Sequence, residues 1–142
     1  MLLAILIAAA GCLGCAGKSR PTEDEVTTDF RHISRAYLVI QSGSNRPPKD
    51  VAEIEKILGE LHKDGLNDKA EEVLTSSRDG QRYVIIMGAN LGASSSNDIL
   101  AYEKTGVDGT RYVLMTSSDV RQIPDSEFRQ STFAKGHRPE AK

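Results

Sequence analysis

The sequence predicts a single α+β domain in which an N-terminal amphipathic helix and shorter helices pack on a three- to four-stranded antiparallel sheet. Two observations support this prediction. Between residues 22 and 76, apolar residues recur at spacings of three and four, which is the period of a helix with one buried face. Between residues 82 and 123, β-branched and aromatic runs of strand length alternate with turn signals. We assign the domain to residues 22–134, a usual length for one compact unit.

The first expected helix begins at a capping box. Thr22 and Glu25 can satisfy backbone N–H groups at the helix N-terminus, and the acids of residues 23–25 suit the positive end of the helix dipole. The apolar residues that follow are three or four positions apart and share one face: Val26, Phe30, Ile33, Tyr37 and Ile40. This face is the predicted buried stripe, and Gly43 is the expected C-terminal cap.

Two shorter helical segments are expected next. Pro47 and Pro48 interrupt the first pattern, and Asp50 is placed to cap a second helix that ends near Gly65. Its apolar face has four members: Val51, Ile54, Leu58 and Leu61. A third segment is expected within residues 67–76, with three apolar contributions: Ala70, Val73 and Leu74.

The second half of the chain predicts an antiparallel meander. Its expected strands are residues 82–87, 99–104, 111–115 and 120–123. Asp108-Gly109 is a strong hairpin signal between the second and third strands. Tyr83 and Tyr112 are most simply explained as cross-strand packing.

The end of the chain is expected to leave the sheet. Pro124 and Asp125 open a helical turn that carries Phe128. Residues 135–142 are polar and are expected to form a loose tail.

The N-terminus has the pattern of a lipoprotein export signal. Residues 1–10 are an unbroken apolar run, which is too short to cross a bilayer and is typical of a signal peptide when small residues follow. Ala9-Ala10-Gly11-Cys12 resembles the lipobox that precedes a lipidated cysteine. We therefore expect residues 1–11 to be the signal peptide and residues 12–21 the linker, with lipid on Cys12 or, alternatively, on Cys15.

Other interpretations of this segment remain. It could be a short buried helix or an uncleaved anchor with a free cysteine pair. A Cys-x-x-Cys redox site is disfavoured, because no βαβ pattern surrounds it. No cysteine follows Cys15, so the domain has no internal disulfide and its stability depends on packing.

Two long segments carry a family resemblance. The chain reads FRHISRAYLVIQSGSNRPPKDVAEIEKIL at residues 30–58 and ILAYEKTGVDGTRYVLMTSSDVRQIPDSEF at residues 99–128. These are similar to the paired helices and the C-terminal strands of type II secretion pseudopilin-like proteins. The resemblance implies a pilin-head fold, with a helix across an antiparallel sheet.

The chain departs from that family in two places. Residues 116–119 are Thr-Ser-Ser-Asp where related sequences have Asp-Gly, so the last hairpin is expected to differ in geometry. The long apolar N-terminal helix of a pilin is missing. We therefore expect a pilin head on a lipid anchor that does not polymerise.

The residue types that could support chemistry are scattered or explained by structure. His32, His62 and His137 have no zinc-type spacing. Residues 94–96 are three serines without the strained turn of a nucleophile. The acids at residues 23–25, like Asp125 and Glu127, fit helix N-terminal preference.

Metal and nucleic-acid binding are also disfavoured. Asp98, Asp108 and Asp119 lie in or beside expected loops, as calcium ligands of some pseudopilins do, but they lack the alternation of an EF-hand. The net charge is -2 with acids and bases interspersed, unlike the basic patch of a nucleic-acid binder. We assign no catalytic residue, cofactor or metal ligand.

The sequence thus predicts a lipoprotein held on a membrane of the bacterial cell envelope, facing the periplasm or the exterior. Its expected partners are the membrane, through the lipid, and other envelope proteins, in a non-enzymatic interaction or structural role. The alternative is a small-ligand or metal-binding envelope module that uses the loop at residues 88–98. An unrecognised envelope enzyme is a third hypothesis, which a buried carboxylate or histidine in a deep cleft would support.

Overall fold

Helices come first along the chain and strands afterwards, as the α+β prediction requires. The computed structural model describes residues 23–66, 68–92 and 97–140. The helical half contains α1 (Glu23–Ser44), α2 (Val51–Lys63) and α3 (Ala70–Val73). The second half contains β1 (Val84–Ile85), β2 (Ile99–Tyr102), β3 (Thr110–Met115) and β4 (Val120–Pro124), then α4 (Asp125–Gln130) and the short 3₁₀ helix η1 (Ala134–Gly136).

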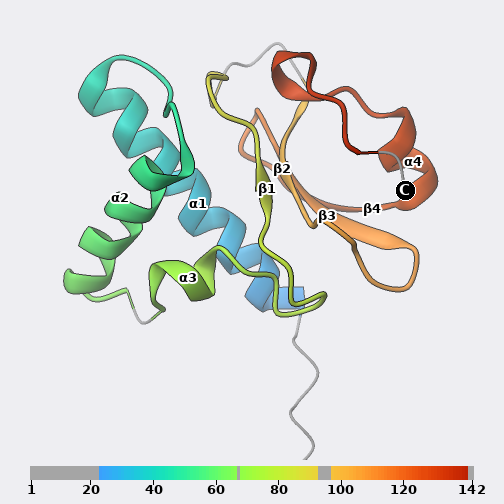
Figure 1. Cartoon of the computed structure of the whole chain (residues 1–142), viewed down its shortest axis with the longest axis horizontal. Helices are drawn as coiled ribbons and strands as arrows, with labels where there is room; N and C mark the ends of the chain where they lie inside the picture. The colour runs from blue at the N-terminus through green and yellow to red at the C-terminus, as the bar shows by residue number, and fades with distance from the viewer. Residues whose placement is uncertain (1–22, 67, 93–96, 141–142) are drawn as a thin grey trace, which may run out of the picture.

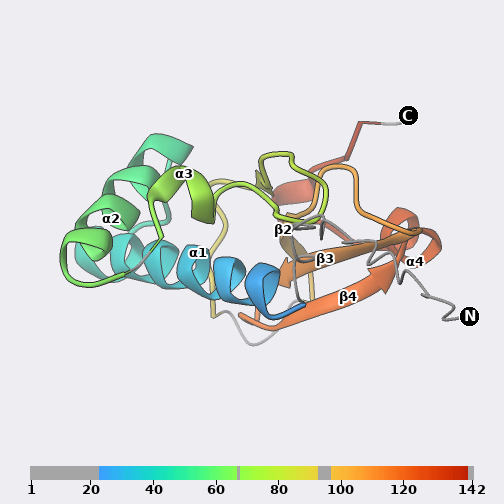
Figure 2. The ribbon, with the colours of Figure 1, turned by 90° about the horizontal axis from the view of Figure 1, so that it is seen from below.

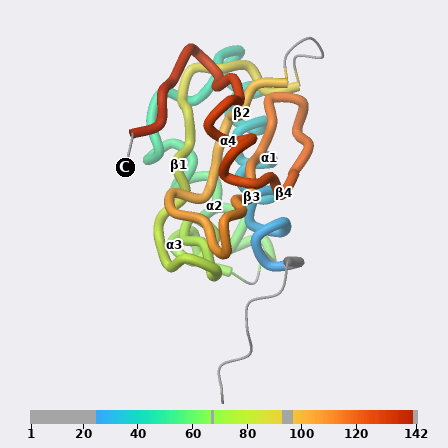
Figure 3. Tube along the Cα trace, turned by 90° about the vertical axis from the view of Figure 1, so that its right-hand side faces the viewer, coloured from blue at the N-terminus to red at the C-terminus, as the bar shows by residue number. Residues whose placement is uncertain are grey.

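The strands form one antiparallel sheet in the order β1-β2-β3-β4, so each strand lies beside its neighbour in sequence. α1 lies between α2 and the sheet, and its N-terminal half runs beside β3 and β4 (Figures 1 and 2). α4 and the end of the chain lie on the side of the sheet away from α2 (Figure 3). All four residues of β2, in the middle of the sheet, are buried, whereas the edge strand β4 keeps exposed residues.

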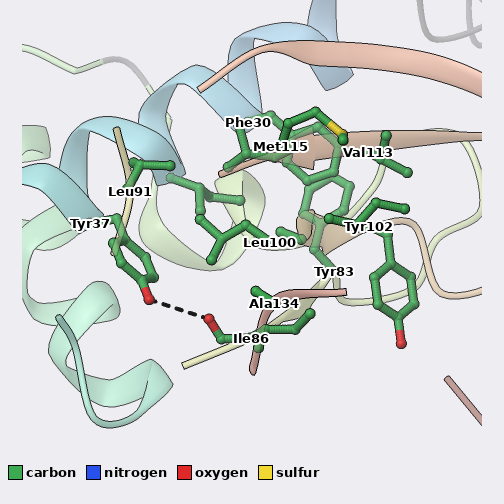
Figure 4. Close-up of a cluster of buried hydrophobic side chains, with 14 of the residues drawn as sticks. Phe30, Tyr37, Tyr83, Ile86, Leu91, Leu100, Tyr102, Val113, Met115 and Ala134 are labelled. Atoms are coloured by element: carbon green, nitrogen blue, oxygen red, sulfur yellow. Dashed lines mark hydrogen bonds between the residues drawn. The ribbon is translucent and has the colours of Figure 1, made fainter. Parts of the chain in front are cut away.

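The predicted stripe of α1 is the centre of the core. All five of its members are buried: Val26, Phe30, Ile33, Tyr37 and Ile40. Figure 4 shows side chains of α1, β2 and β3 meeting there. The Tyr37 hydroxyl donates to the carbonyl of Ala89 at 2.7 Å and accepts from the Ala89 N–H at 3.2 Å. Burial raises the pKa of Tyr37 to about 12, so this hydroxyl stays protonated and ties α1 to the chain that follows β1.

The ends of the helices correct one prediction and confirm another. Gly43 is not the cap of α1, because the helix continues to Ser44 and the left-handed residue after it is Asn45, with φ 52°. Asparagine tolerates that conformation better than most residues, so it can stand where glycine usually ends a helix. At α2, the predicted cap is confirmed, since Asp50 accepts the N–H of Glu53 at 3.0 Å. Thr22 lies outside the described residues.

The predicted hairpin between β2 and β3 is confirmed. Val107 and Thr110 exchange two backbone hydrogen bonds of 2.9 and 3.0 Å. Between them, Asp108 and Gly109 have positive φ angles of 51° and 71°, as a two-residue turn of the primed type requires.

The first expected strand and the tyrosine pair are corrected. β1 has only two residues, and its partner is β2 rather than β3. Tyr83 and Tyr112 therefore do not lie opposite each other on neighbouring strands. The ring of Tyr83 contacts Phe30 of α1, with ring centres 4.6 Å apart.

The expected loose tail starts later than residue 135. Lys135 and Gly136 belong to η1, and the His137 ring lies against Tyr102, whose hydroxyl is 2.9 Å from His137 Nε2. Phe133 stacks edge-on with Tyr102 and Phe128. Aromatic packing holds this part of the chain on the sheet. The polar composition of residues 135–142 did not indicate that contact.

The turn between β3 and β4 strains its third residue. Ser118 has φ 74° and donates its N–H to the carbonyl of Met115 at 2.9 Å. A side chain in that conformation costs about 1 kcal/mol, which glycine avoids. Ser118→Gly should therefore raise the free energy of unfolding by roughly 0.5–1 kcal/mol in urea titrations. Ser117→Gly is the control: it removes the 2.9 Å bond from Ser117 to Asp119 at a residue without positive φ, and should destabilise. Equal effects of the two changes would contradict this account.

Candidate functional site

The lipidation residues and the serine run cannot be placed. Cys12, Cys15 and residues 94–96 lie outside the described residues. Among the described residues, no helix combines the length and apolarity needed to cross a bilayer.

The three histidines lie on or beside different elements of the fold. His62 is exposed near the end of α2, with Nδ1 2.7 Å from the carbonyl of Leu66. His137 lies against Tyr102 on the opposite side of the sheet. His32 is half-buried on α1, beside the buried stripe, and its Nδ1 is buried without a hydrogen-bond partner. Burial lowers the pKa of His32, against the opposing effect of Asp68.

The loop carboxylates are not assembled either. Asp98 precedes β2, Asp108 is in the β2–β3 hairpin, and Asp119 is in the β3–β4 turn 3.7 Å from Arg121. Asp125 and Glu127 lie in the first turn of α4, as expected, and Asp125 also pairs with Arg111 at 2.7 Å. Within the described ranges, no group of three or more His, Cys, Asp or Glu side chains could hold a metal ion.

One fully buried carboxylate was missed by the sequence analysis. Glu103 follows β2 and has no exposed surface. Its oxygens accept hydrogen bonds of 2.8 Å from the Ser76 hydroxyl, the Arg78 guanidinium and the backbone N–H of Tyr112. The Arg78 guanidinium also lies 4.9 Å from the centre of the Tyr112 ring.

The residues around Glu103 join two loops. Asp79 accepts the N–H groups of Thr105 and Gly106 at 2.9 and 3.0 Å. A side chain at position 106 would meet the carbonyl oxygen of Thr110 at 2.5 Å, so only glycine fits this close approach. The hydrogen bonds of Asp79 and Glu103 join the segment before β1 to the β2–β3 hairpin. The three bonds to Glu103 also occupy its carboxylate oxygens. The arrangement is a structural clamp.

A second buried carboxylate lies on α1. Asp29 is 9% exposed and accepts a hydrogen bond from the Tyr83 hydroxyl at 2.9 Å. Burial raises the pKa of Asp29 from 3.8 to about 7, the hydrogen bond lowers it, and the charges of Asp68 and Glu25 raise it further. The pKa of Tyr83 is also raised, mainly by burial. Asp29 is therefore a group with a pKa near neutral pH inside the fold.

A polar hollow lies where α1 ends. It measures about 450 Å³ and is open to solvent, with six lining residues: Gln41, Asn45, Arg46, Asn90, Leu91 and Gly92. The Gln41 amide is occupied, because it donates to the carbonyl of Leu91 at 3.1 Å and accepts its N–H at 3.0 Å. Arg46 is also paired, with Glu53 at 2.7 Å, and Asn45 and Asn90 make no side-chain hydrogen bond within the described residues.

The exposed face of α1 is the most distinctive surface of the described residues. Leu38 and Val39 are 38% and 44% exposed, and they are the large hydrophobic residues left uncovered. Arg31 precedes them by two helical turns and Arg35 by one, and all four line a shallow hollow of about 420 Å³. We call Arg31, Arg35, Leu38 and Val39 the arginine face.

Two features of the sequence outside the buried stripe indicate this face. From Phe30 to Ser44, α1 has no aspartate or glutamate. Leu38 and Val39 also fall off the buried three-and-four spacing, so their exposure follows from the helical period. For Glu103 no such signal exists, because its hydrogen-bond partners lie 27 and 25 positions earlier and 9 positions later in the chain.

No protein-family model, curated protein or solved structure matches this chain.

Proposed function

We propose that this chain is a lipid-anchored protein of the bacterial cell envelope whose domain has a non-catalytic interaction or structural role. The observation that carries the proposal is the N-terminal pattern: an apolar run at residues 1–10, small residues before Cys12, and no cysteine after Cys15. Acyl chains on the cysteine would insert into the bilayer, where each buried methylene contributes about 0.8 kcal/mol.

The spacing between the cysteine and the fold suits a tethered domain. Residues 12–22 separate the proposed lipid from the start of α1. At about 3.3 Å per residue they reach about 36 Å when fully extended. The start of the domain would therefore stay within about 36 Å of the membrane, and the domain could still rotate on this segment.

The buried charges of the domain support a non-catalytic role. Glu103 is saturated by three donors, and Asp29 is covered by Tyr83. A reactive acid or base needs access to a substrate proton. The helix-then-meander order is also the arrangement implied by the resemblance to a pilin head, which is an assembly and interaction domain.

The anchor is tested by labelling bacterial cells with a tagged fatty acid. The wild-type protein should be labelled and should fractionate with membranes. Cys12→Ala should lose both properties, whereas Cys15→Ala should keep them, because only the cysteine after the cleavage site receives lipid. The reverse result would move the lipid to Cys15. Labelling that survives both substitutions together would contradict the proposal.

The polar hollow favours one second candidate, a small-ligand module. It borders the 88–98 segment and presents the free amides of Asn45 and Asn90, which suit the hydroxyl groups of a neutral polar ligand. A ligand at 100 times its dissociation constant adds about 2.7 kcal/mol of stability, which a thermal-shift panel of sugars and amino acids detects. The shift should disappear in Asn90→Ala. A flat panel would count against this candidate.

A further inference from the structure

We propose that the arginine face of α1 rests on an anionic lipid bilayer, so that the tethered domain lies on the membrane in one preferred orientation. This inference rests on the proposed lipid anchor and adds to it a second membrane contact, its chemistry and its location.

The first argument is the state of the two arginines. Arg31 and Arg35 form no ion pair among the described residues, whereas five other arginines lie within 3.7 Å of a carboxylate: Arg46, Arg78, Arg82, Arg111 and Arg121. No acidic residue occurs in α1 from position 30 to its end. The positive charge of this face is therefore available to an outside partner.

The second argument is the apolar pair beside that charge. Leu38 and Val39 both lie one helical turn after Arg35 and two turns after Arg31, on the same exposed side of α1. Helices that lie in a membrane interface combine basic residues, which meet lipid phosphates, with apolar side chains that enter the boundary of the acyl region. The arginine face has both in one short stretch.

The third argument concerns the alternatives. A second copy of the chain would bring arginines against arginines, and like charges at a contact are unfavourable. A separate protein partner normally needs about 800 Å² on each side. From Arg31 to Val39 the face extends only about 12 Å along the helix, at about 1.5 Å per residue.

A membrane contact does not need a large area when a lipid already holds the protein. The second binding event is then intramolecular, and its effective concentration is set by the short linker of residues 12–22. Each arginine close to an anionic surface favours the bound state about fivefold. Together, Arg31 and Arg35 should favour the docked orientation by about 25-fold.

The chain has no tryptophan, so one introduced tryptophan reports its own surroundings. The full-length gene carrying Leu38→Trp is expressed in bacteria, and the acylated product is reconstituted into vesicles that contain brominated phosphatidylcholine as quencher. One set has no anionic lipid and the other has about a third phosphatidylglycerol, which supplies the negative surface. Val39→Trp is a second reporter, and Lys56→Trp, at an exposed position of α2, is the control.

Docking predicts that the fluorescence of the Leu38→Trp and Val39→Trp proteins is blue-shifted and quenched in the anionic vesicles. The quenching should be at least about threefold stronger than in the neutral vesicles, because the anionic surface favours the docked orientation. The fluorescence of the Lys56→Trp protein should be the same in both. Arg31→Gln with Arg35→Gln should abolish the difference, and salt at about 0.5 M should reduce it.

The outcomes separate the anchor from the docking. Protein that floats with both kinds of vesicle but shows no quenching at positions 38 and 39, or equal quenching in both, keeps its anchor and overturns the docking. Quenching that depends on an added envelope protein overturns it in favour of a protein partner. Protein that floats with neither vesicle overturns the anchor and the inference together.

Discussion

Asp29→Asn should raise the free energy of unfolding by about 2–4 kcal/mol at pH 8 and change it little at pH 4. The carboxyl is buried in α1, and burial raises its pKa from 3.8 to about 7. Each pKa unit corresponds to about 1.4 kcal/mol, so ionising Asp29 inside the fold costs up to about 4 kcal/mol. Asparagine has no charge to bury and can still accept the bond from the Tyr83 hydroxyl.

The sign of the pH dependence follows from the raised pKa. Below pH 3.8, Asp29 is protonated in both states and its burial costs no charge. As pH rises toward 7, the unfolded chain ionises while the folded protein holds the proton, so stability is lost. Wild-type stability should therefore fall between about pH 4 and 7, and the Asp29→Asn protein should lack that fall.

Urea titrations across this pH range measure the effect. Asp108→Asn is the matched control, because Asp108 is exposed and asparagine also tolerates its positive φ. That change should shift the free energy by less than about 0.5 kcal/mol at every pH. A pH profile shared by wild type and Asp29→Asn would show that Asp29 ionises normally in the fold.

Glu103→Ala should cost about 3–5 kcal/mol, a large part of the roughly 5–15 kcal/mol that usually stabilises a domain. The substitution leaves the mostly buried Arg78 guanidinium without its carboxylate partner. It also removes the acceptor of the Ser76 hydroxyl and of the Tyr112 N–H. Uncompensated buried charge and unmade hydrogen bonds both favour the unfolded state.

An exposed ion pair gives the comparison. Glu55 lies 2.6 Å from Arg82, and both side chains are more than a third exposed. Glu55→Ala should cost only about 0.2–1 kcal/mol, because solvent already screens that pair. Urea midpoints of the two variants decide the matter: if Glu103→Ala costs no more than Glu55→Ala, the clamp around Glu103 does not stabilise the fold.

Features encoded by neighbouring residues were predictable from the sequence. The stripe of α1 follows from a helical period sustained over about four turns, and all of its members are buried. The Asp50 cap and the Asp108-Gly109 turn are also local, since each depends on backbone geometry within three residues. These local features account for the α+β class and most element positions.

Features that depend on distant partners were not predictable. β1 is shorter than its apolar run because the backbone N–H of Tyr83 bonds to Leu74, before the strand, rather than to the sheet. Asp29 looks like an ordinary polar residue beside the stripe, and only the approach of Tyr83, 54 positions later, encloses it. The arginine face could have been found from the missing acids, but its exposure depends on where α2 and the sheet cover α1.

The mass of the mature protein, purified from its native host, tests the central claim most directly. The account predicts a chain that begins at Cys12, lacks residues 1–11, and carries the added mass of acyl groups on that cysteine. A full-length, unmodified chain in the soluble fraction would contradict it.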